Sequence, residues 1–137
     1  ITFAENSGCL LINTPHLSIK KIQTNDEINL VSKTEFAWLG RKDFIINSGG
    51  VKINPEELEN KLIESYDQNF VISSVKDEIL GQKLVIVFEK KIPEDWIKST
   101  EKFQKIYKPK KAYSLKKFLY VNGKADRKYI KNLIEKF

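Results

Sequence analysis

Short apolar runs with polar breaks between them occupy the first forty residues of the chain. The runs span residues 9–13, 17–23, 28–32 and 35–39, and little helical periodicity accompanies them. Runs of this length between turn-forming residues are typical of β-strands. Because four short strands are a poor basis for a separate core, we expect a small β-subdomain that ends a preceding domain.

A helix signal and two strand signals follow. Asn54 is a suitable cap, Pro55 suits the first helical position, and Glu57 follows the cap as in a capping box. Residues 70–76 and 82–89 give the strongest strand patterns in the chain. The expected apolar face of this first helix consists of Leu58, Leu62, Ile63 and Tyr66.

The last third predicts further mixed structure. A second helix is expected from Pro93 to before Pro109, and short strands are expected at 112–115 and 118–121. Asp126 can cap a last helix. The inward residues are Trp96, Ile97, Phe103 and Ile106 in the second helix, and Tyr129, Ile130, Leu133, Ile134 and Phe137 in the last. The pattern predicts an α+β fold over residues 44–137, a small mixed sheet flanked by about three helices.

The composition indicates a packed core, and the charge is distributed unevenly along the chain. The 137 residues are 41% hydrophobic and 11% aromatic, which argues against wholesale disorder. Of the net charge of +6, residues 88–137 carry the excess, with fifteen basic side chains against six acidic ones. Such a region can attract a nucleotide, a coenzyme or a nucleic acid, although a solvated lysine surface explains the charge more simply.

Other features of the composition restrict the setting. The lone Cys9 lies in an apolar run and predicts a buried structural thiol in a reducing, cytoplasmic protein. No apolar run approaches the roughly 20 residues of a membrane span. The chain contains no Met and opens on Ile1, so we expect a fragment of a longer polypeptide.

Residues 38–57 predict a joint between two structural units. The charged triplet Arg41-Lys42-Asp43 separates two apolar runs, which is typical of an exposed connector. Ser48-Gly49-Gly50 follows, and glycine pairs let backbone approach a ligand closely. Taken singly, Arg41 and Asp43 are better explained as a surface ion pair, and Ser48-Gly49-Gly50 as a plain turn.

Lys124 is the other candidate for chemistry. It follows Asn122-Gly123, a typical hairpin turn, and Arg127 and Lys128 come soon after it. A lysine ammonium at such a tip can act as a point charge on a phosphoryl or carboxylate oxygen.

The order of these motifs resembles the adenylate-forming superfamily, which comprises acyl-CoA synthetases, peptide-synthetase adenylation domains and luciferases. The resemblance extends over essentially the whole chain. Its motifs are Thr24-Asn25-Asp26, Gly40-Arg41-Lys42-Asp43, Ser48-Gly49-Gly50 with Lys52, Pro55-Glu56-Glu57-Leu58-Glu59, residues 77–83, Tyr107-Lys108-Pro109-Lys110 and Asn122-Gly123-Lys124-Ala125-Asp126-Arg127.

Within the superfamily, residues 36–41 and 46–50 look most like o-succinylbenzoate–CoA ligases of menaquinone synthesis. The resemblance implies an AMP-forming acid–thiol ligase that works in two steps. A small carboxylic acid first reacts with ATP to give an acyl-adenylate and pyrophosphate, and the thiol of coenzyme A then displaces AMP.

The resemblance also implies roles for single residues. Asp26 matches the aspartate that binds the ribose hydroxyls, and Arg41 matches an arginine that also reaches the ribose. Lys124 matches the adenylation lysine, which bridges the substrate carboxylate and the α-phosphate. Gly49 and Gly50 match the backbone along the pantetheine passage.

Asp43 matches the hinge residue about which the C-terminal domain turns. The implied organisation is therefore terminal strands of the N-terminal domain at 1–41, a hinge at 42–43 and a C-terminal domain at 44–137. The resemblance implies that the partner of this chain is its own large N-terminal domain, which carries the acyl pocket, the phosphate loop and the ligands of Mg²⁺. We expect the fragment to be inactive alone, with no membrane span and no nucleic acid partner.

Three departures from the family pattern concern the site loops. Asn25 replaces a glycine of the ribose motif, Phe44 replaces a common acidic residue after the hinge, and no Pro-Arg-Thr run precedes Asn122. Two alternatives stay open at this point. One is an adenylation domain that loads a carrier-protein phosphopantetheine, and the other is a basic nucleic-acid-binding module with steeply salt-dependent affinity.

Overall fold

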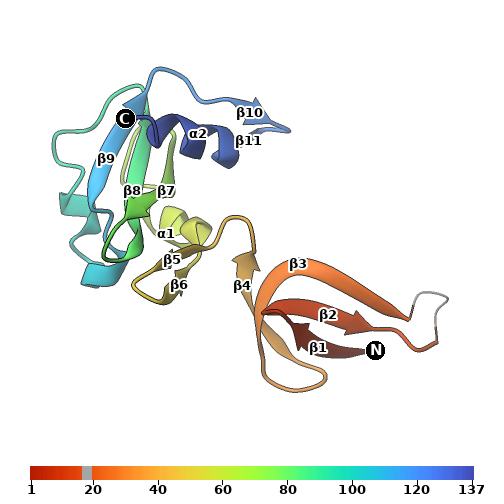
Figure 1. The fold of residues 1–137 in the computed structure, drawn as a ribbon. Coiled ribbons are helices and arrows are strands. Elements are labelled where there is room, and N and C mark those ends of the chain that lie inside the picture. The colour runs from red at the N-terminus through yellow and green to blue at the C-terminus, as the bar shows by residue number, and fades with distance from the viewer. Residues whose placement is uncertain (17–19) are drawn as a thin grey trace. The chain divides into compact units, whose positions relative to one another are not determined.

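The computed structural model describes residues 1–16 and 20–137, which divide into two compact units, residues 1–45 and 46–137. Each unit has its own sheet (Figure 1). Leu17 and Ile19, which belong to a predicted strand, lie outside the described residues.

The first unit contains a four-stranded antiparallel sheet in the order β1-β2-β3-β4. Its strands are β1 (Thr2–Asn6), β2 (Cys9–Asn13), β3 (Lys21–Leu30) and β4 (Phe36–Arg41). The predicted run at 9–13 is β2, and the run at 35–39 forms most of β4. The pattern did not predict β1, because Thr2–Asn6 is too polar at its end to stand out.

Strand β3 passes through the break that the sequence predicts at Asn25-Asp26. Its register is irregular on both sides, between Cys9 and Leu11 of β2 and between Glu27 and Ile28 of β3 itself. The Thr24 hydroxyl donates to the Leu10 carbonyl at 2.8 Å and accepts from the Asp26 amide at 3.3 Å. Side-chain hydrogen bonds therefore accommodate polar residues inside a bulged strand.

The core of the first unit is small. Cys9, Leu10 and Ile28 are its buried hydrophobic residues among those described, and Cys9 is a free, buried thiol as predicted. The rings of Phe3 and Phe36 meet edge to face, with centroids 4.9 Å apart.

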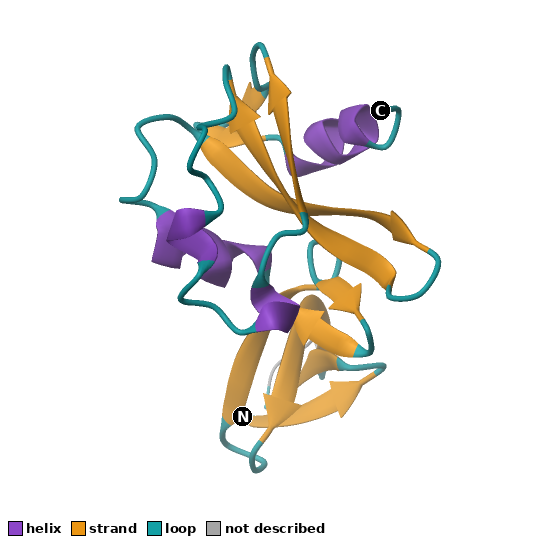
Figure 2. Ribbon diagram, turned by 90° about the vertical axis from the view of Figure 1, so that its left-hand side faces the viewer, coloured by secondary structure: helices purple, strands orange, loops and turns teal. Residues whose placement is uncertain are grey.

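The second unit is built on a five-stranded mixed sheet (Figure 2). Strands β5 (Ile46–Ser48), β6 (Val51–Ile53), β8 (Gly81–Glu89) and β7 (Phe70–Asp77) pair antiparallel, whereas β9 (Lys111–Leu115) pairs parallel with β8. The two strongest strand patterns in the sequence are β7 and β8.

Both faces of β8 are buried, because successive side chains of a strand point to opposite sides of the sheet. The two helices of the unit are α1 (Pro55–Leu62) and α2 (Arg127–Ile134). One core cluster joins Leu84, Ile86 and Phe88 with Leu58 and Leu62 of α1; the other joins Val85 and Val87 with Ile130 and Ile134 of α2. The helices therefore cover opposite faces of the sheet.

Side-chain caps fix both helix starts as the sequence predicts. Asn54 accepts a hydrogen bond from the Glu56 amide at 3.0 Å, and Asp126 accepts one from the Tyr129 amide at 3.1 Å. The predicted apolar face of α1 is wrong at Ile63, which follows the end of the helix and is 65% exposed.

The predicted second helix is wrong. Residues 93–109 contain turns and two short 3-10 helices, Lys98–Thr100 and Lys105–Tyr107. The Thr100 hydroxyl donates to the Ile97 carbonyl at 2.7 Å, a local bond that competes with helical pairing. Trp96, Phe103 and Ile106 still pack against the α1-side core, which is the cluster that contains Leu58 and Leu62 of α1. The spacing of these apolar residues therefore indicates burial but not a helix.

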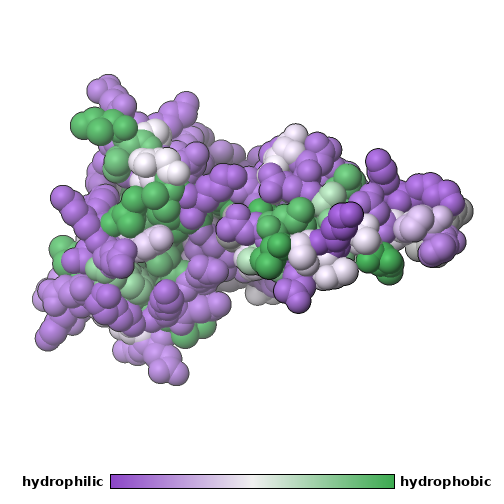
Figure 3. Space-filling view, turned by 90° about the horizontal axis from the view of Figure 1, so that it is seen from below, coloured by the Kyte–Doolittle hydropathy of each residue, from purple (hydrophilic) through white to green (hydrophobic). Residues whose placement is uncertain are grey.

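The surface seen from below is mostly hydrophilic, with hydrophobic side chains gathered in a few patches (Figure 3). Scattered exposed hydrophobic residues are normal for folded proteins. Within the described part of the chain, no helix has the length and apolar character that crossing a membrane requires. The fold class, a mixed α+β structure with a preceding β-sheet, is confirmed.

Candidate functional site

Asp26 and Arg41 lie opposite each other on neighbouring strands of the first unit, where β3 pairs with β4. The Arg41 Nη1 lies 3.5 Å from the Asp26 Oδ1, and the two side chains are 51% and 28% exposed. An ion pair this exposed contributes little to stability. It presents one acceptor and one cationic donor together, which suits hydroxyl or phosphate oxygens.

Asp43 is exposed in a turn directly after β4. The Arg41 carbonyl accepts hydrogen bonds from the amides of Phe44 and Ile45 at 3.0 and 3.1 Å. Strand β4 ends at Arg41, so Arg41 and Asp43 do not share one continuous strand face. The carboxylate of Asp43 instead belongs to the short connection before β5.

Gly49 and Gly50 form the two-residue turn between β5 and β6, with φ values of +58° and +83°. The Gly49 amide donates to the Leu80 carbonyl at 2.9 Å, which attaches the turn to the loop before β8. A Cβ at Gly49 would lie 3.3 Å from Leu80 Cδ2, whereas a Cβ at Gly50 would meet nothing within 4 Å. The turn therefore has a packed side at Gly49 and an open side at Gly50.

We expect Gly49→Ala to destabilise the chain more than Gly50→Ala. Both substitutions place an alanine in the left-handed region, at a cost of about 1–2 kcal/mol each. Only the first also crowds Leu80. Urea unfolding of the two variants measures the difference; equal losses would show that the Leu80 contact has no energetic effect.

Lys124 lies on a separate hairpin made of β10 (Tyr120–Val121) and β11 (Lys124–Ala125). Asn122 and Gly123 form its turn with φ values of +52° and +80°, the conformation that the Asn-Gly pair predicts. The Lys124 side chain is exposed, and among residues 46–137 it makes no hydrogen bond or ion pair. A free ammonium at the start of β11 is available to an anionic ligand.

A polar network that the sequence did not reveal lies at the base of this hairpin. Glu89 ends β8, and its Oε2 accepts from the Phe118 amide at 2.8 Å. Its Oε1 accepts from the Tyr120 hydroxyl at 3.0 Å and from Asn69 Nδ2 at 3.1 Å. The only sequence signal is an acid placed directly after the apolar run of β8.

The network shifts two pKa values. Burial by itself raises the pKa of the Glu89 carboxyl, but the hydrogen bonds from Phe118, Asn69 and Tyr120, with the nearby charge of Lys90, lower that pKa overall. Burial raises the pKa of the Tyr120 hydroxyl, and the hydrogen bond to Glu89 and its negative charge raise it further.

The lowered pKa of Glu89 predicts a pH-dependent contribution to stability. The contribution is fully present above the ordinary carboxyl value of 4.5 and is lost as the pH falls below it, through the folded-state pKa. We expect Glu89→Gln to be less stable than the wild type at pH 7, with the difference shrinking below pH 4.5. Urea unfolding of both proteins from pH 3 to 7 measures it; a difference constant with pH would contradict the assignment.

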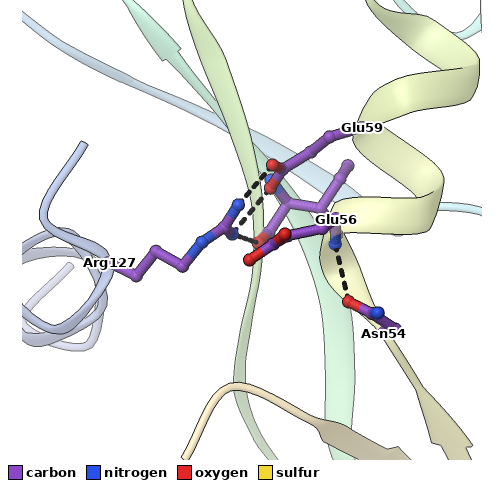
Figure 4. A network of polar contacts seen from close by, with 5 residues as sticks. Asn54, Glu56, Glu59 and Arg127 are labelled. Atoms are coloured by element: carbon purple, nitrogen blue, oxygen red, sulfur yellow. Dashed lines mark hydrogen bonds and ion pairs between the residues drawn. The ribbon is translucent and has the colours of Figure 1, made fainter. Parts of the chain in front are cut away.

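Glu59 of α1 and Arg127 of α2 form a second network (Figure 4). Arg127 contacts both carboxylate oxygens of Glu59, with Nη1 2.7 Å from Oε2 and Nη2 on Oε1. The Ile72 amide donates to Glu59 Oε2 at 2.8 Å, and Arg127 Nη1 donates to the Ile72 carbonyl at 3.4 Å. In the sequence, Glu59 lies next to Leu58 of the apolar face of α1. This position is the sequence feature that could have indicated a glutamate that faces the interior.

A groove of about 360 Å³, lined by three lysines and one acidic residue, Glu57, lies beside α1. Its lining includes Lys52, Lys61 and Lys102, together with Asn54, whose side-chain Nδ2 is buried and has no hydrogen-bond partner among the described residues. The groove can attract an anion. Within residues 1–16 and 20–137, no group of three or more His, Cys, Asp or Glu side chains is arranged to hold a metal ion.

The sequence-predicted residues thus fall into separate places. Asp26 and Arg41 meet in the first unit, while Gly49 and Lys124 lie on different hairpins of the second.

No protein-family model and no curated protein sequence matches this chain. Solved structures do match. An acyl-CoA synthetase (AMP-forming)/AMP-acid ligase II-like protein from Dyadobacter fermentans is 29% identical, with a TM-score of 0.68 over 93% of this chain and 39% of that protein. The fold of this chain therefore matches part of the fold of AMP-forming acyl-CoA synthetases.

Two further structures agree in fold at lower identity. Wild-type E. coli MenE with a bound analogue of OSB-AMS is 18% identical, with a TM-score of 0.63 over 98% of this chain and 34% of MenE. The anthranilate CoA ligase AuaEII in complex with anthranoyl-AMP is also 18% identical, with a TM-score of 0.61 over 82% of this chain and 24% of that enzyme.

These likenesses support the adenylate-forming superfamily and no particular ligase within it. The chain spans about two fifths or less of the length of each of these enzymes.

Proposed function

We propose that this chain is the C-terminal part of an ATP-dependent acid–CoA ligase that forms an acyl-adenylate and then a thioester. The observation that carries the proposal is the 29% identity to an AMP-forming acyl-CoA synthetase over 93% of the chain. The ordered motifs from Asp26 to Arg127 support it independently, because they follow one another as in that superfamily.

The nucleotide would be bound by Asp26 and Arg41. A carboxylate accepts hydrogen bonds from ribose hydroxyls, and a guanidinium donates to ribose or phosphate oxygens. Their opposed places on β3 and β4 allow both to reach one ligand. The AuaEII complex with anthranoyl-AMP and the MenE complex with an OSB-AMS analogue support an adenylate as the species bound.

Lys124 would act in the first half-reaction. Its ammonium would bind the substrate carboxylate and the α-phosphate, holding two anions together and stabilising the charge that develops between them. The exposed and unpaired state of Lys124 within the second unit is compatible with this role. Mg²⁺ would be held by residues outside this chain, so no step described for these residues depends on it.

The second half-reaction would use the turn of Gly49 and Gly50, whose open side at Gly50 would line the passage for pantetheine. Asp43 would be the hinge that exchanges the two poses. Rotation there would release the amides of Phe44 and Ile45 from the Arg41 carbonyl, since these hydrogen bonds close the turn.

The substrate acid would be o-succinylbenzoate. Residues 36–41 and 46–50 support this choice, and the fold likeness to E. coli MenE is compatible with it. The complete enzyme would then act in the cytoplasm, in menaquinone synthesis.

A product assay of the complete enzyme tests the proposal. With ATP, o-succinylbenzoate and coenzyme A, we expect AMP, pyrophosphate and a CoA thioester in equal amounts. ADP as the nucleotide product would contradict the proposal. Thioester formation only on a phosphopantetheinylated carrier protein would assign the chain to the carrier-loading adenylation domains.

A further inference from the structure

We propose that Glu59 and Glu89 are positioning residues that hold the Lys124 hairpin in place from its two ends. The inference rests on the proposed function, because it treats the placement of Lys124 as the quantity that matters for adenylation.

The hairpin has few stabilising contacts of its own. It pairs only Tyr120 with Ala125 and Val121 with Lys124. A two-stranded hairpin is marginally stable in water unless something else packs on it. Leu119, Tyr120 and Val121 are 47%, 43% and 53% exposed, so burial contributes only part of the required stabilisation.

Glu89 anchors the strand that enters the hairpin. Its two oxygens bind the Phe118 amide and the Tyr120 hydroxyl, residues that bracket Leu119. Asn69 Nδ2 donates both to Glu89 at 3.1 Å and to the Tyr120 hydroxyl at 2.7 Å, which completes a three-residue ring. The Phe118 side chain is buried in the α2-side core, so this anchor connects β10 to the body of the unit.

Glu59 anchors the segment that leaves the hairpin. Arg127, the first residue of α2, makes a forked contact with Glu59, and both side chains are largely buried, at 19% and 16% exposure. Glu59 also binds the Ile72 amide of β7, so α1, β7 and α2 meet at one carboxylate (Figure 4). Forked contacts between arginine and carboxylate fix orientation as well as distance.

A backbone bond joins the two anchors. The Asp126 amide donates to the Leu119 carbonyl at 2.7 Å, so the entering and leaving segments are held together beneath the turn. Lys124 is connected to the rest of the unit through this frame.

The Lys124 side chain is flexible and has no partner in the second unit. The position of its ammonium therefore depends on how firmly the backbone of the hairpin is held. A displacement of about 1 Å in a reacting group can reduce a rate roughly 10²-fold. Loss of either carboxylate would therefore impair the half-reaction that uses Lys124. The thioester half-reaction, which uses the Gly49-Gly50 turn, would be spared.

The test uses the complete enzyme with Glu59→Gln, Glu89→Gln and Arg127→Lys. Glutamine preserves shape and removes the charge, while lysine preserves the charge and removes the fork. Glu64→Gln, at an exposed glutamate beyond the end of α1, is the matched control.

The first readout is the separation of the half-reactions. We expect each variant to lose about 10- to 100-fold in kcat for acid-dependent pyrophosphate exchange. Thioester formation from pre-made acyl-adenylate and the KM for ATP should change less than about 3-fold, and Glu64→Gln should match the wild type. An equal loss of rate in both half-reactions, or an unchanged rate of pyrophosphate exchange, would overturn the proposal.

The second readout is hydrogen–deuterium exchange of residues 118–126, which is independent of catalysis. We expect faster exchange there in Glu59→Gln and Glu89→Gln, with the strands β7 and β8 still protected. If the wild type catalyses no pyrophosphate exchange with any acid, the proposed function fails. Hydrogen–deuterium exchange alone then decides whether Glu59 and Glu89 hold the hairpin in place. Unchanged protection of the hairpin would overturn the proposal.

Discussion

Lys124→Ala in the complete enzyme is expected to reduce acid-dependent adenylation by 10²- to 10³-fold or more. The reason is electrostatic: a cation that stabilises charge developing between carboxylate and α-phosphate is lost at a position with no substitute on β10 or β11. Thioester formation from pre-made acyl-adenylate should remain within about 3-fold of the wild type, because that step would use the Gly49-Gly50 turn instead. Pyrophosphate exchange and single-turnover thioester formation measure the two steps separately.

Lys128→Ala is the matched control for this prediction. Lys128 is also an exposed cation near the start of α2, and removing it changes the net charge equally. We expect it to leave both half-reactions intact. If both variants lost activity alike, the effect would come from the general positive potential of residues 88–137; if Lys124→Ala impaired both steps equally, its assigned role would be wrong.

Phe88→Ala is expected to cause the largest loss of stability, about 3–5 kcal/mol. The Phe88 side chain is fully buried in the α1-side core, where its ring meets Tyr66 at 4.9 Å and Phe70 at 6.2 Å between centroids. Removing it leaves a cavity that strands on both sides prevent from closing. Urea unfolding of the chain, followed by fluorescence of Trp96, measures the loss.

A Trp38→Phe background keeps that signal specific, because Trp38 lies in the first unit and Trp96 packs on the affected cluster. Ile79→Ala is the control, since Ile79 is 92% exposed and should change stability by less than about 0.5 kcal/mol. A loss for Phe88→Ala no larger than the control would mean that β8 is not the centre of this core.

The fold could be predicted where local patterns and burial agree. The apolar runs of β7 and β8 indicate strands buried on both faces, and Asn54 and Asp126 mark the helix starts that the structure has. The pattern failed over residues 93–109, where apolar residues pack from irregular chain at a spacing that mimics a helix. It also placed a break within β3, because side-chain hydrogen bonds of Thr24 are not visible in a hydropathy pattern.

Only part of the candidate site could be predicted from the sequence. Asn122-Gly123 predicts the turn that presents Lys124, and the pairing of Asp26 with Arg41 follows once β3 and β4 are adjacent. Glu59 and Arg127 could not be paired from sequence, since they lie 68 residues apart and only the packing of α1 and α2 around β7 brings them together. Glu89 and Tyr120 have the same long-range origin, with a separation of 31 residues. The functional roles of all the site residues stay predictions: Asp26, Arg41, Asp43, Gly49, Gly50 and Lys124.

The central claim is that this chain belongs to a protein that activates an acid as its adenylate. Acid-dependent exchange of labelled pyrophosphate into ATP by the complete enzyme, without coenzyme A, tests it most directly. We predict pyrophosphate exchange with o-succinylbenzoate that Lys124→Ala reduces by about 10²-fold or more and Lys128→Ala preserves. No exchange with o-succinylbenzoate or with any acid from a panel of aromatic, short-chain and fatty acids would contradict the account.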